Sequence, residues 1–179
     1  MFSSIKAATL AVIAVAAGKA LAESHTVTFA NNCGFGTPTL IGQGGAVLST
    51  GGAYTSNGPL VGAIAYLQTG ELSSLFVLWF LMSTLPAGGC GFNGEGCTLV
   101  ETTLVNPTCA GCGSSTDLSL IPPHAFSVTT GFGYLGSCSP AGADCNNANC
   151  NTAFHQPSDT FVQVACQADD ANLVITFCL

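Results

Sequence analysis

Apolar and polar residues alternate along many short stretches of this chain, with the two-residue period of β-strands. The clearest example is His25–Phe29, which alternates strictly and then ends at an Asn-Asn-Cys-Gly turn. Comparable β-rich runs follow at 39–41, 46–48, 63–67, 98–104, 117–121, 126–129, 161–166 and 173–177. Clusters of Gly, Asn, Asp and Pro separate these runs. Many short strands at this spacing predict an all-β fold, a sandwich or flattened barrel.

The stretch 71–88 departs from this pattern. It contains eight consecutive large apolar residues, Leu75–Met82. The run is over-long and over-aromatic for a core strand, it is shorter than the roughly 20 residues of a membrane span, and it lacks the charged face of an amphipathic anchor. Codons for Gly70-Glu71 and Ala87-Gly88 can carry the GT and AG edges of an intron in frame. A retained intron and a genuine hydrophobic insertion are therefore both considered.

Residues 1–22 have the features of a secretory signal. Lys6 belongs to a short positive segment, Ala7–Ala17 is apolar, and Ala20-Leu21-Ala22 has the small residues of a cleavage site. Ser24 also follows such a pattern, so cleavage after Ser24 is an alternative. We expect 23–179 to form a single secreted, extracellular domain, because its length suffices for one core.

The distribution of positive charge excludes several functions. Lys6 and Lys19 are the only Lys or Arg residues, so cleavage after Ala22 takes the formal net charge from −7 to −9. Without cations the mature chain has no footprint for nucleic acid and no phosphate-binding lysine or arginine. An anionic membrane surface would repel it. We expect a monomer that carries no cofactor, binds no nucleic acid and does not insert stably into a membrane.

Ten cysteines lie after the signal, an even number that predicts five disulfides in a secreted chain. A zinc site is disfavoured, because Cys109-x-x-Cys112 has no second C-x-x-C with which to combine. No metal site is expected from the cysteines.

Several segments resemble the thaumatin-like protein family, in the order of that family. The opening strand Val27–Cys33 reads VTFANNC, and the closing segments Phe161–Cys166 and Leu173–Cys178 read FVQVAC and LVITFC. Between them, Thr98–Leu104 reads TLVETTL, and Asp117–Val128 contains DLSL and AFSV. Together these matches cover most of the mature chain except 71–88, and they are similar to the small secreted members with ten cysteines.

The resemblance implies a disulfide-rich β-sandwich and a pattern of disulfides. It suggests that Cys33 pairs with Cys178, joining the first strand to the last. It further suggests the pairs Cys90–Cys97, Cys138–Cys166 and Cys145–Cys150. The remaining two cysteines, Cys109 and Cys112, have no clear counterpart in the family and are expected to form a local bridge.

Thaumatin-like proteins carry an acidic cleft of one Arg, one Glu and three Asp, where some members bind or slowly hydrolyse β-1,3-glucan. The resemblance places Glu101 on the Glu and Asp117 on the first Asp, and Asp159 lies near the last one. The second Asp is replaced within Pro122-Pro123-His124, and the Arg is absent. Glu101 and Asp117 are the candidate catalytic pair, since glycoside hydrolysis uses one protonated and one ionised carboxyl. The alternative is that both only hold strands through backbone hydrogen bonds, and the missing residues favour binding without turnover.

Aromatic side chains are candidates for stacking on sugar rings. They are Tyr54, Tyr66, Phe132 and Tyr134. Phe132-Gly133-Tyr134 alternates across a glycine, which would place both rings on one face of a strand. Ordinary core packing is the alternative, and it is more expected for Tyr66 than for Tyr134.

The histidines allow a different hypothesis. Cleavage after Ser24 would leave His25 at the N-terminus, where amine and imidazole can chelate copper, with His124 or His155 as a third ligand. The alternative is that these histidines are solvated structural residues.

The sequence thus predicts a secreted protein of a fungal or plant cell wall that binds β-1,3-glucan, with weak endo-glucanase activity or none. The alternative from another class is a non-enzymatic structural, effector or inhibitor protein without a glycan site. Exposed aromatics beside Glu101 would favour glucan binding, whereas a cleft covered only by Ser and Thr would favour the alternative.

Overall fold

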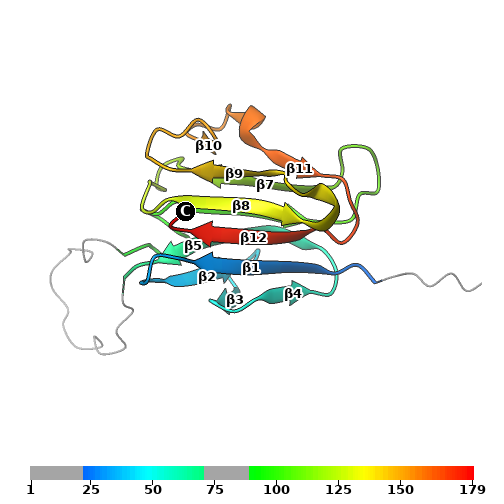
Figure 1. Ribbon diagram of the computed structural model, residues 1–179, viewed down its shortest axis with the longest axis horizontal. Helices are drawn as coiled ribbons and strands as arrows, with labels where there is room; N and C mark the ends of the chain where they lie inside the picture. The colour runs from blue at the N-terminus through cyan, green and yellow to red at the C-terminus, as the bar shows by residue number, and fades with distance from the viewer. Residues whose placement is uncertain (1–21, 71–88) are drawn as a thin grey trace, which may run out of the picture.

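The computed structural model describes residues 22–70 and 89–179 of the chain, so all but the last residue of the predicted signal 1–22, and the whole hydrophobic stretch 71–88, lie outside the described residues. Two sheets make up the fold, with β1 and β12 side by side in one of them (Figure 1). The predicted all-β, disulfide-rich architecture is confirmed. Within the described ranges, no helix is long and apolar enough to cross a membrane.

The first sheet has five strands in the order β4-β1-β12-β8-β9. Its strands are β1 (His25–Asn31), β4 (Tyr54–Ser56), β8 (Thr130–Leu135), β9 (Gly142–Cys145) and β12 (Asn172–Phe177). The first and last strands, β1 and β12, pair in parallel, with Val27 opposite Leu173 and Asn31 opposite Phe177. The other pairs of this sheet are antiparallel.

The second sheet has seven strands in the order β10-β7-β6-β5-β2-β3, with β11 also paired to β7. Its strands are β2 (Thr37–Ile41), β3 (Val47–Thr50), β5 (Leu60–Gln68), β6 (Leu99–Leu104), β7 (Ser114–Ser119), β10 (Ala153–Phe154) and β11 (Val164–Cys166). Two short 3₁₀ helices, η1 (Gly136–Cys138) and η2 (Thr160–Val162), lie in the connections.

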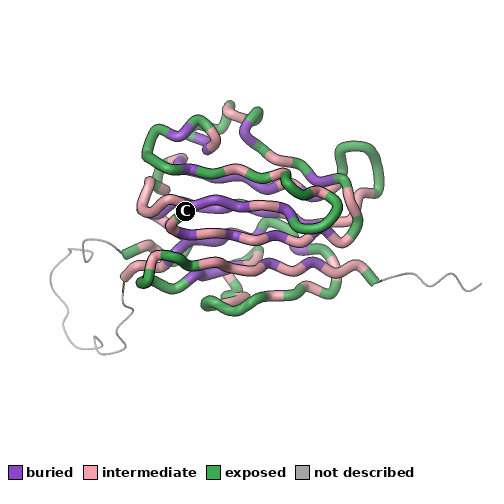
Figure 2. The backbone as a smooth tube through the Cα atoms, in the orientation of Figure 1, coloured by how far each residue is buried: buried purple, intermediate pink, exposed green. Residues whose placement is uncertain are grey.

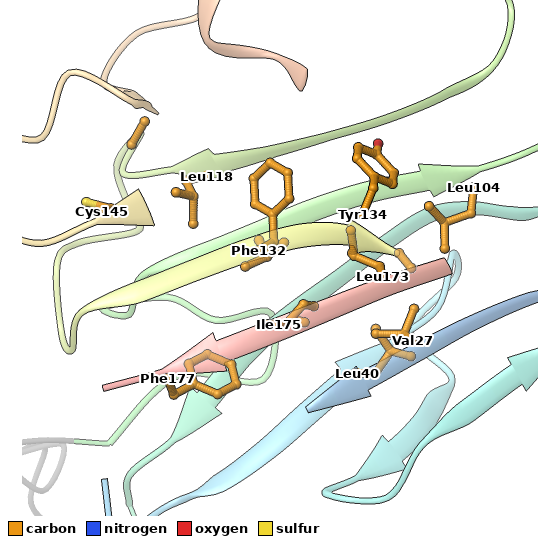
Figure 3. Packing of buried hydrophobic residues seen from close by; sticks show 14 of the residues in the cluster. Val27, Leu40, Leu104, Leu118, Phe132, Tyr134, Cys145, Leu173, Ile175 and Phe177 are labelled. Atoms are coloured by element: carbon orange, nitrogen blue, oxygen red, sulfur yellow. The ribbon is translucent and has the colours of Figure 1, made fainter. Parts of the chain in front are cut away.

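The core lies between the sheets, and along strands such as β12 buried residues alternate with half-buried ones (Figure 2). The first sheet contributes Leu173, Ile175 and Phe177 from β12, all fully buried. The second sheet contributes Leu118 and Leu104 (Figure 3). We call the core side of the second sheet its inner face and the opposite side its outer face. A smaller apolar cluster of Ile41, Tyr66, Cys97 and Leu99 lies on that outer face.

All five predicted disulfides are present. They are Cys33–Cys178, Cys90–Cys97, Cys109–Cys112, Cys138–Cys166 and Cys145–Cys150. The first spans 145 residues and fixes the parallel β1–β12 pair at its end. For so long a loop the chain-entropy model gives about 4–5 kcal/mol of stabilisation.

The predicted strand at 126–129 is wrong. This segment lies in a connection that side chains hold, because the Ser127 backbone N–H donates to Thr98 Oγ1 at 3.0 Å and the Thr98 N–H donates to Ser127 Oγ at 3.1 Å. The predicted run 161–166 divides into η2 and β11, since Val162 closes a turn onto Asp159. Three short strands, β4, β9 and β10, were not predicted, and β8 was expected only through the alternation of Phe132-Gly133-Tyr134.

Candidate functional site

Glu101 and Asp117 lie directly opposite one another on neighbouring strands. They form a register pair of the antiparallel β6–β7 ladder. On β6, Val100 and Leu104 belong to the core, so the alternation directs Glu101 to the outer face. Directly opposed residues have Cβ atoms about 4.5–5.5 Å apart, which brings the two carboxyl groups together. The β6–β7 register therefore brings together the two residues that the sequence proposes as a pair, and their catalytic role stays a prediction.

The two carboxyl groups occupy different environments. Glu101 is exposed, whereas Asp117 is only 5% exposed. The Gln163 side-chain amide donates to Asp117 Oδ1 at 3.4 Å, and Asp117 Oδ2 is buried with no hydrogen-bond partner in the structure. Burial, followed by the negative charge of Glu101, raises the pKa of Asp117 to about 7, while the hydrogen bond from Gln163 opposes the shift. A substantial share of Asp117 is therefore protonated near neutral pH, where an ordinary aspartate is ionised.

An open depression of about 260 Å³ surrounds this pair. Its lining includes Gly62, Glu101, Thr103, Ser115, Asp117 and Gln163. The Gly62 N–H donates to Thr103 Oγ1 at 3.0 Å, which fixes one hydroxyl at the rim. Hydroxyl, amide and carboxyl groups thus converge there, and none of the aromatic side chains that the structure describes takes part in the lining.

Gln163 is a site residue that sequence reasoning missed. It follows η2 and lies 46 residues from Asp117 along the chain, so only the packing of η2 and β11 beside β7 brings the two together. Phe161, two residues earlier, is 79% exposed. Gln163 is the polar residue within the apolar run 161–166, and this interruption was the only signal of it in the sequence.

A second depression, of about 530 Å³, lies further along the same outer face. Thr37, Thr39, Thr50 and Gln68 line part of it, and Thr39 pairs with Thr50 across β2 and β3. No Asp or Glu of 22–70 or 89–179 belongs to this lining. The surface offers hydrogen bonds but no group for acid–base chemistry.

The structure places Asp159 apart from the acidic pair. Its carboxylate accepts hydrogen bonds from the backbone N–H groups of His155 and Gln156 at 3.1 and 3.2 Å and from the Gln156 amide at 3.1 Å. The Gln156 amide, followed by these N–H groups, lowers the pKa of Asp159. Asp159 therefore closes its own turn, and it does not line the depression.

The prediction that Phe132 and Tyr134 present their rings to a sugar is wrong. Both rings do lie on one face of β8, with centroids 6.3 Å apart in an edge-to-face arrangement. That face is the core side, where Phe132 is 5% and Tyr134 2% exposed (Figure 3). Burial raises the pKa of the Tyr134 hydroxyl to about 12. Tyr66 is buried as expected, and Tyr54, half-buried opposite Val27, packs against the core from the first sheet.

The structure also contradicts the copper hypothesis. The His25 ring is fully buried, and its nitrogens lie 2.8 Å from the Ala171 carbonyl and 2.9 Å from Glu23 Oε1. His124 contacts the Gly94 carbonyl, and His155 contacts the Cys150 carbonyl. Across 22–70 and 89–179, no three His, Cys, Asp or Glu side chains come together to hold a metal.

Glu23 joins His25 to the β6–β7 connection. Its Oε1 accepts from the Asn106 N–H at 2.6 Å as well as from His25, and these hydrogen bonds, that of His25 first, lower the pKa of Glu23. The Ser24 N–H donates to Asp170 Oδ1 at 3.0 Å. Cleavage after Ser24 would remove the Glu23 carboxylate from this network, whereas cleavage after Ala22 would retain it.

Comparison of the chain with known protein-family models and with curated protein sequences found no significant match. The thaumatin-like resemblance therefore stays a prediction, which depends on the segments quoted from the sequence.

Proposed function

We propose that this protein is secreted, associates with a cell wall and binds β-1,3-glucan in the depression around Glu101 and Asp117. The five disulfides fit an oxidising, extracellular environment. The observation that carries the proposal is the buried Asp117 Oδ2, which has no protein partner beneath an open, hydroxyl-lined surface. A buried polar atom without a partner is costly, and a ligand hydroxyl would satisfy it.

The geometry favours binding over hydrolysis. Glycosidases place the scissile bond between two carboxyls, about 5–5.5 Å apart in retaining and 6.5–9.5 Å apart in inverting enzymes. Here both carboxyls project from one sheet face, and Asp117 lies beneath the surface while Glu101 stands at it. A sugar can receive hydrogen bonds from one side, but it is not enclosed between the two groups.

The binding test is depletion of the oxidised mature protein from solution by insoluble β-1,3-glucan, with cellulose and chitin as comparison polymers. We expect Glu101→Gln to weaken binding about tenfold, because a hydrogen bond to a charged group is lost. Asp169→Asn is the matched control, since it removes one negative charge from an exposed position in the β11–β12 turn. Equal loss in both variants, or no depletion by any polymer, would refute the proposal.

Phe161 is the candidate for ring stacking, in place of the buried Phe132 and Tyr134. We expect Phe161→Ala to weaken depletion, and Phe35→Ala is its control because Phe35 is 54% exposed on the β1–β2 connection. Reducing-sugar release from soluble β-1,3-glucan tests turnover. Release that Glu101→Gln abolishes would make the protein a weak endo-β-1,3-glucanase.

The second candidate is a non-enzymatic structural, effector or inhibitor protein without a glycan site. The observation that favours it is that the described residues contribute no aromatic side chain to the lining of the depression. Absence of depletion by all three polymers would support this candidate and direct the search to protein partners.

A further inference from the structure

The Cys109–Cys112 disulfide differs from the other four in its exposure. Cys109 and Cys112 are both exposed, whereas the other eight cysteines are all buried or half-buried. The comparable short bridge is Cys145–Cys150, in which both cysteines are buried. Exposure matters because thiol–disulfide exchange requires an incoming thiolate to reach a sulfur atom.

This disulfide joins no two elements of the fold. It spans three residues inside the connection from β6 to β7. Two of the other bridges join distant elements, β1 with β12 through Cys33–Cys178 and η1 with β11 through Cys138–Cys166. Breaking Cys109–Cys112 therefore releases only its own small loop.

Hydrogen bonds hold the base of that loop without the disulfide. The Val105 N–H donates to the buried Ser114 Oγ at 3.0 Å, and the Ser114 hydroxyl donates to the Val105 carbonyl at 3.2 Å. On the other side, Gln167 Oε1 accepts from the N–H groups of Gly111 and Gly113 at 3.0 and 3.2 Å. These contacts keep the loop in place when its sulfur atoms change partners.

We propose that Cys109–Cys112 is a site of thiol–disulfide exchange, which accepts two electrons from an external dithiol while the rest of the fold stays intact. One thiolate of the dithiol attacks a sulfur of the bridge, forms a mixed disulfide and releases the other cysteine as a thiolate. The second thiol of the dithiol then attacks the mixed disulfide. The products are the oxidised dithiol and the Cys109 and Cys112 thiols, so bonds and electrons balance.

The negative charge of the protein bears on which thiols can react with the Cys109–Cys112 bridge. The mature chain contains no Lys or Arg, and the Asn106 side chain beside the loop accepts from the N–H of Asp170 at 2.6 Å, next to a second acid, Asp169. An anionic thiol approaches this surface against repulsion that salt screens. The site is therefore expected to favour neutral or cationic thiols over anionic ones.

The test uses the oxidised mature protein with limiting dithiothreitol, followed by iodoacetamide. Trypsin has no site in 23–179 because no Lys or Arg occurs there, so chymotrypsin supplies the peptides for mass spectrometry. We expect Cys109 and Cys112 to be alkylated at least about tenfold faster than the other eight cysteines, with the circular dichroism of the sheets unchanged. Equal or faster alkylation at another bridge, or loss of sheet signal in step with that at Cys109, would overturn the proposal.

Two double variants separate exchange from a structural role. We expect Cys109→Ala with Cys112→Ala to abolish the fast alkylation and to keep the melting temperature within about 5 °C of the parent. The matched control, Cys145→Ala with Cys150→Ala, removes a bridge that is also short but buried, and we expect a larger drop. An equal or larger drop for the first variant would assign Cys109–Cys112 a structural role and overturn the proposal.

The charge selection is tested by comparing cysteamine with 3-mercaptopropionate at equal thiolate concentration. Cysteamine is expected to reduce the bridge faster, with a gap that narrows as salt is added. A faster reaction with 3-mercaptopropionate would overturn the selection by charge. Because these experiments involve no polysaccharide, they succeed or fail independently of glucan binding.

Discussion

On the inner face of the β6–β7 pair, the hydroxyls of Thr102 and Thr116 lie 2.6 Å apart, and the Tyr134 hydroxyl lies 2.9 Å from Thr116 Oγ1. The adjacent register pair, Glu101 and Asp117, faces outward. Asp117 is also buried, but one of its carboxyl oxygens has no partner among the described residues. The inner face has satisfied each of these polar groups, as buried groups in stable cores generally are. The outer face leaves one unsatisfied beside an exposed carboxylate.

The same two strands therefore serve two purposes. Their inner residues stabilise the sandwich through apolar packing and paired hydroxyls, whereas the outer pair costs stability through desolvation and like charge. Such a cost is typical of a site that is kept for binding or chemistry. Removing the buried charge of Asp117 on the outer face should accordingly raise stability, whereas truncating a core residue on the inner face should lower it.

The largest effect is expected on the inner face, at Leu118. Its side chain is fully buried in the main core cluster, so Leu118→Ala leaves a cavity and should lower the free energy of unfolding by about 3–5 kcal/mol. Guanidinium denaturation at neutral pH measures it. Ser115→Ala on the outer face is the control and should change stability by less than about 0.5 kcal/mol. A loss below about 1 kcal/mol at Leu118 would contradict the assignment of the inner face as the stabilising one.

The ionised side chain of Asp117 should destabilise the fold, and the pH dependence of the free energy of unfolding should show this. The folded-state pKa is raised from 3.8 to about 7, so between these values the unfolded chain has released a proton that the folded protein retains. The contribution of Asp117 to stability is therefore greatest below about pH 4, falls as pH rises toward 7 and is then constant. One pKa unit corresponds to about 1.4 kcal/mol, so the rise from 3.8 to about 7 sets the fall in the free energy of unfolding at about 4 kcal/mol.

Asp117→Asn removes this ionisation. We expect the variant to lose the decline between pH 4 and 7 and to be more stable than the parent at pH 8. Asp169→Asn, at an exposed acid, is the control for the loss of one charge. Two results together would contradict a destabilising role of Asp117: Asp117→Asn less stable than the parent at pH 8, and a free energy of unfolding that declines no more in the parent than in the variant between pH 4 and 7.

A smaller loss of stability is expected at Tyr134. Its hydroxyl lies 2.9 Å from Thr116 Oγ1 and 3.1 Å from the Val164 carbonyl, so Tyr134→Phe removes a buried hydrogen bond worth about 1–2 kcal/mol. Because the ring faces the core, depletion by β-1,3-glucan should not change. Weaker depletion by a variant that is still fully folded would place Tyr134 in the site after all.

The alternation of residues predicts the strands better than it predicts their sides. The period of two placed Phe132 and Tyr134 together, but it does not say whether the shared side is core or solvent, and tertiary packing decided for the core. At β1 and β12 the same signal sufficed, since their apolar residues are numerous and their ends are joined by Cys33–Cys178. The segment 126–129 looked like a strand but forms side-chain bonds to Thr98, which no local pattern encodes.

The sequence predicted the acidic pair of the candidate site but not the other residues that line the depression. The family resemblance brought Glu101 and Asp117 forward, and the β6–β7 register places them together. Gln163 and Gly62 reach the depression from distant parts of the chain, so only the folded arrangement reveals them. Asp159 resembled a cleft residue in sequence, yet its carboxylate is occupied by its own turn.

The smallest effect is expected from deleting 71–88, the segment between β5 and β6. A Cβ built on Gly70 would lie 2.8 Å from the Cα of Gly89, so the two ends are close to the 3.8 Å that one peptide bond spans. The Gln68 side chain already holds both ends, because its Oε1 accepts from the N–H groups of Gly70 and Cys90. Joining Gly70 to Gly89 should therefore leave the register of β5 with β6, and with it Glu101, in place.

We expect the free energy of unfolding of the deletion variant to lie within about 1 kcal/mol of that of the parent, because the entropy of loop closure changes only slowly with loop length. Denaturation and glucan depletion should then agree for the two proteins. Sequencing of the mature transcript separates the two origins of the segment: its absence from the message supports a retained intron, and reads across codons 71–88 support a genuine insertion. If the deletion variant stays folded but loses the glucan binding that depends on Glu101, then strands β5, β6 and β7 alone do not suffice for binding at the outer face.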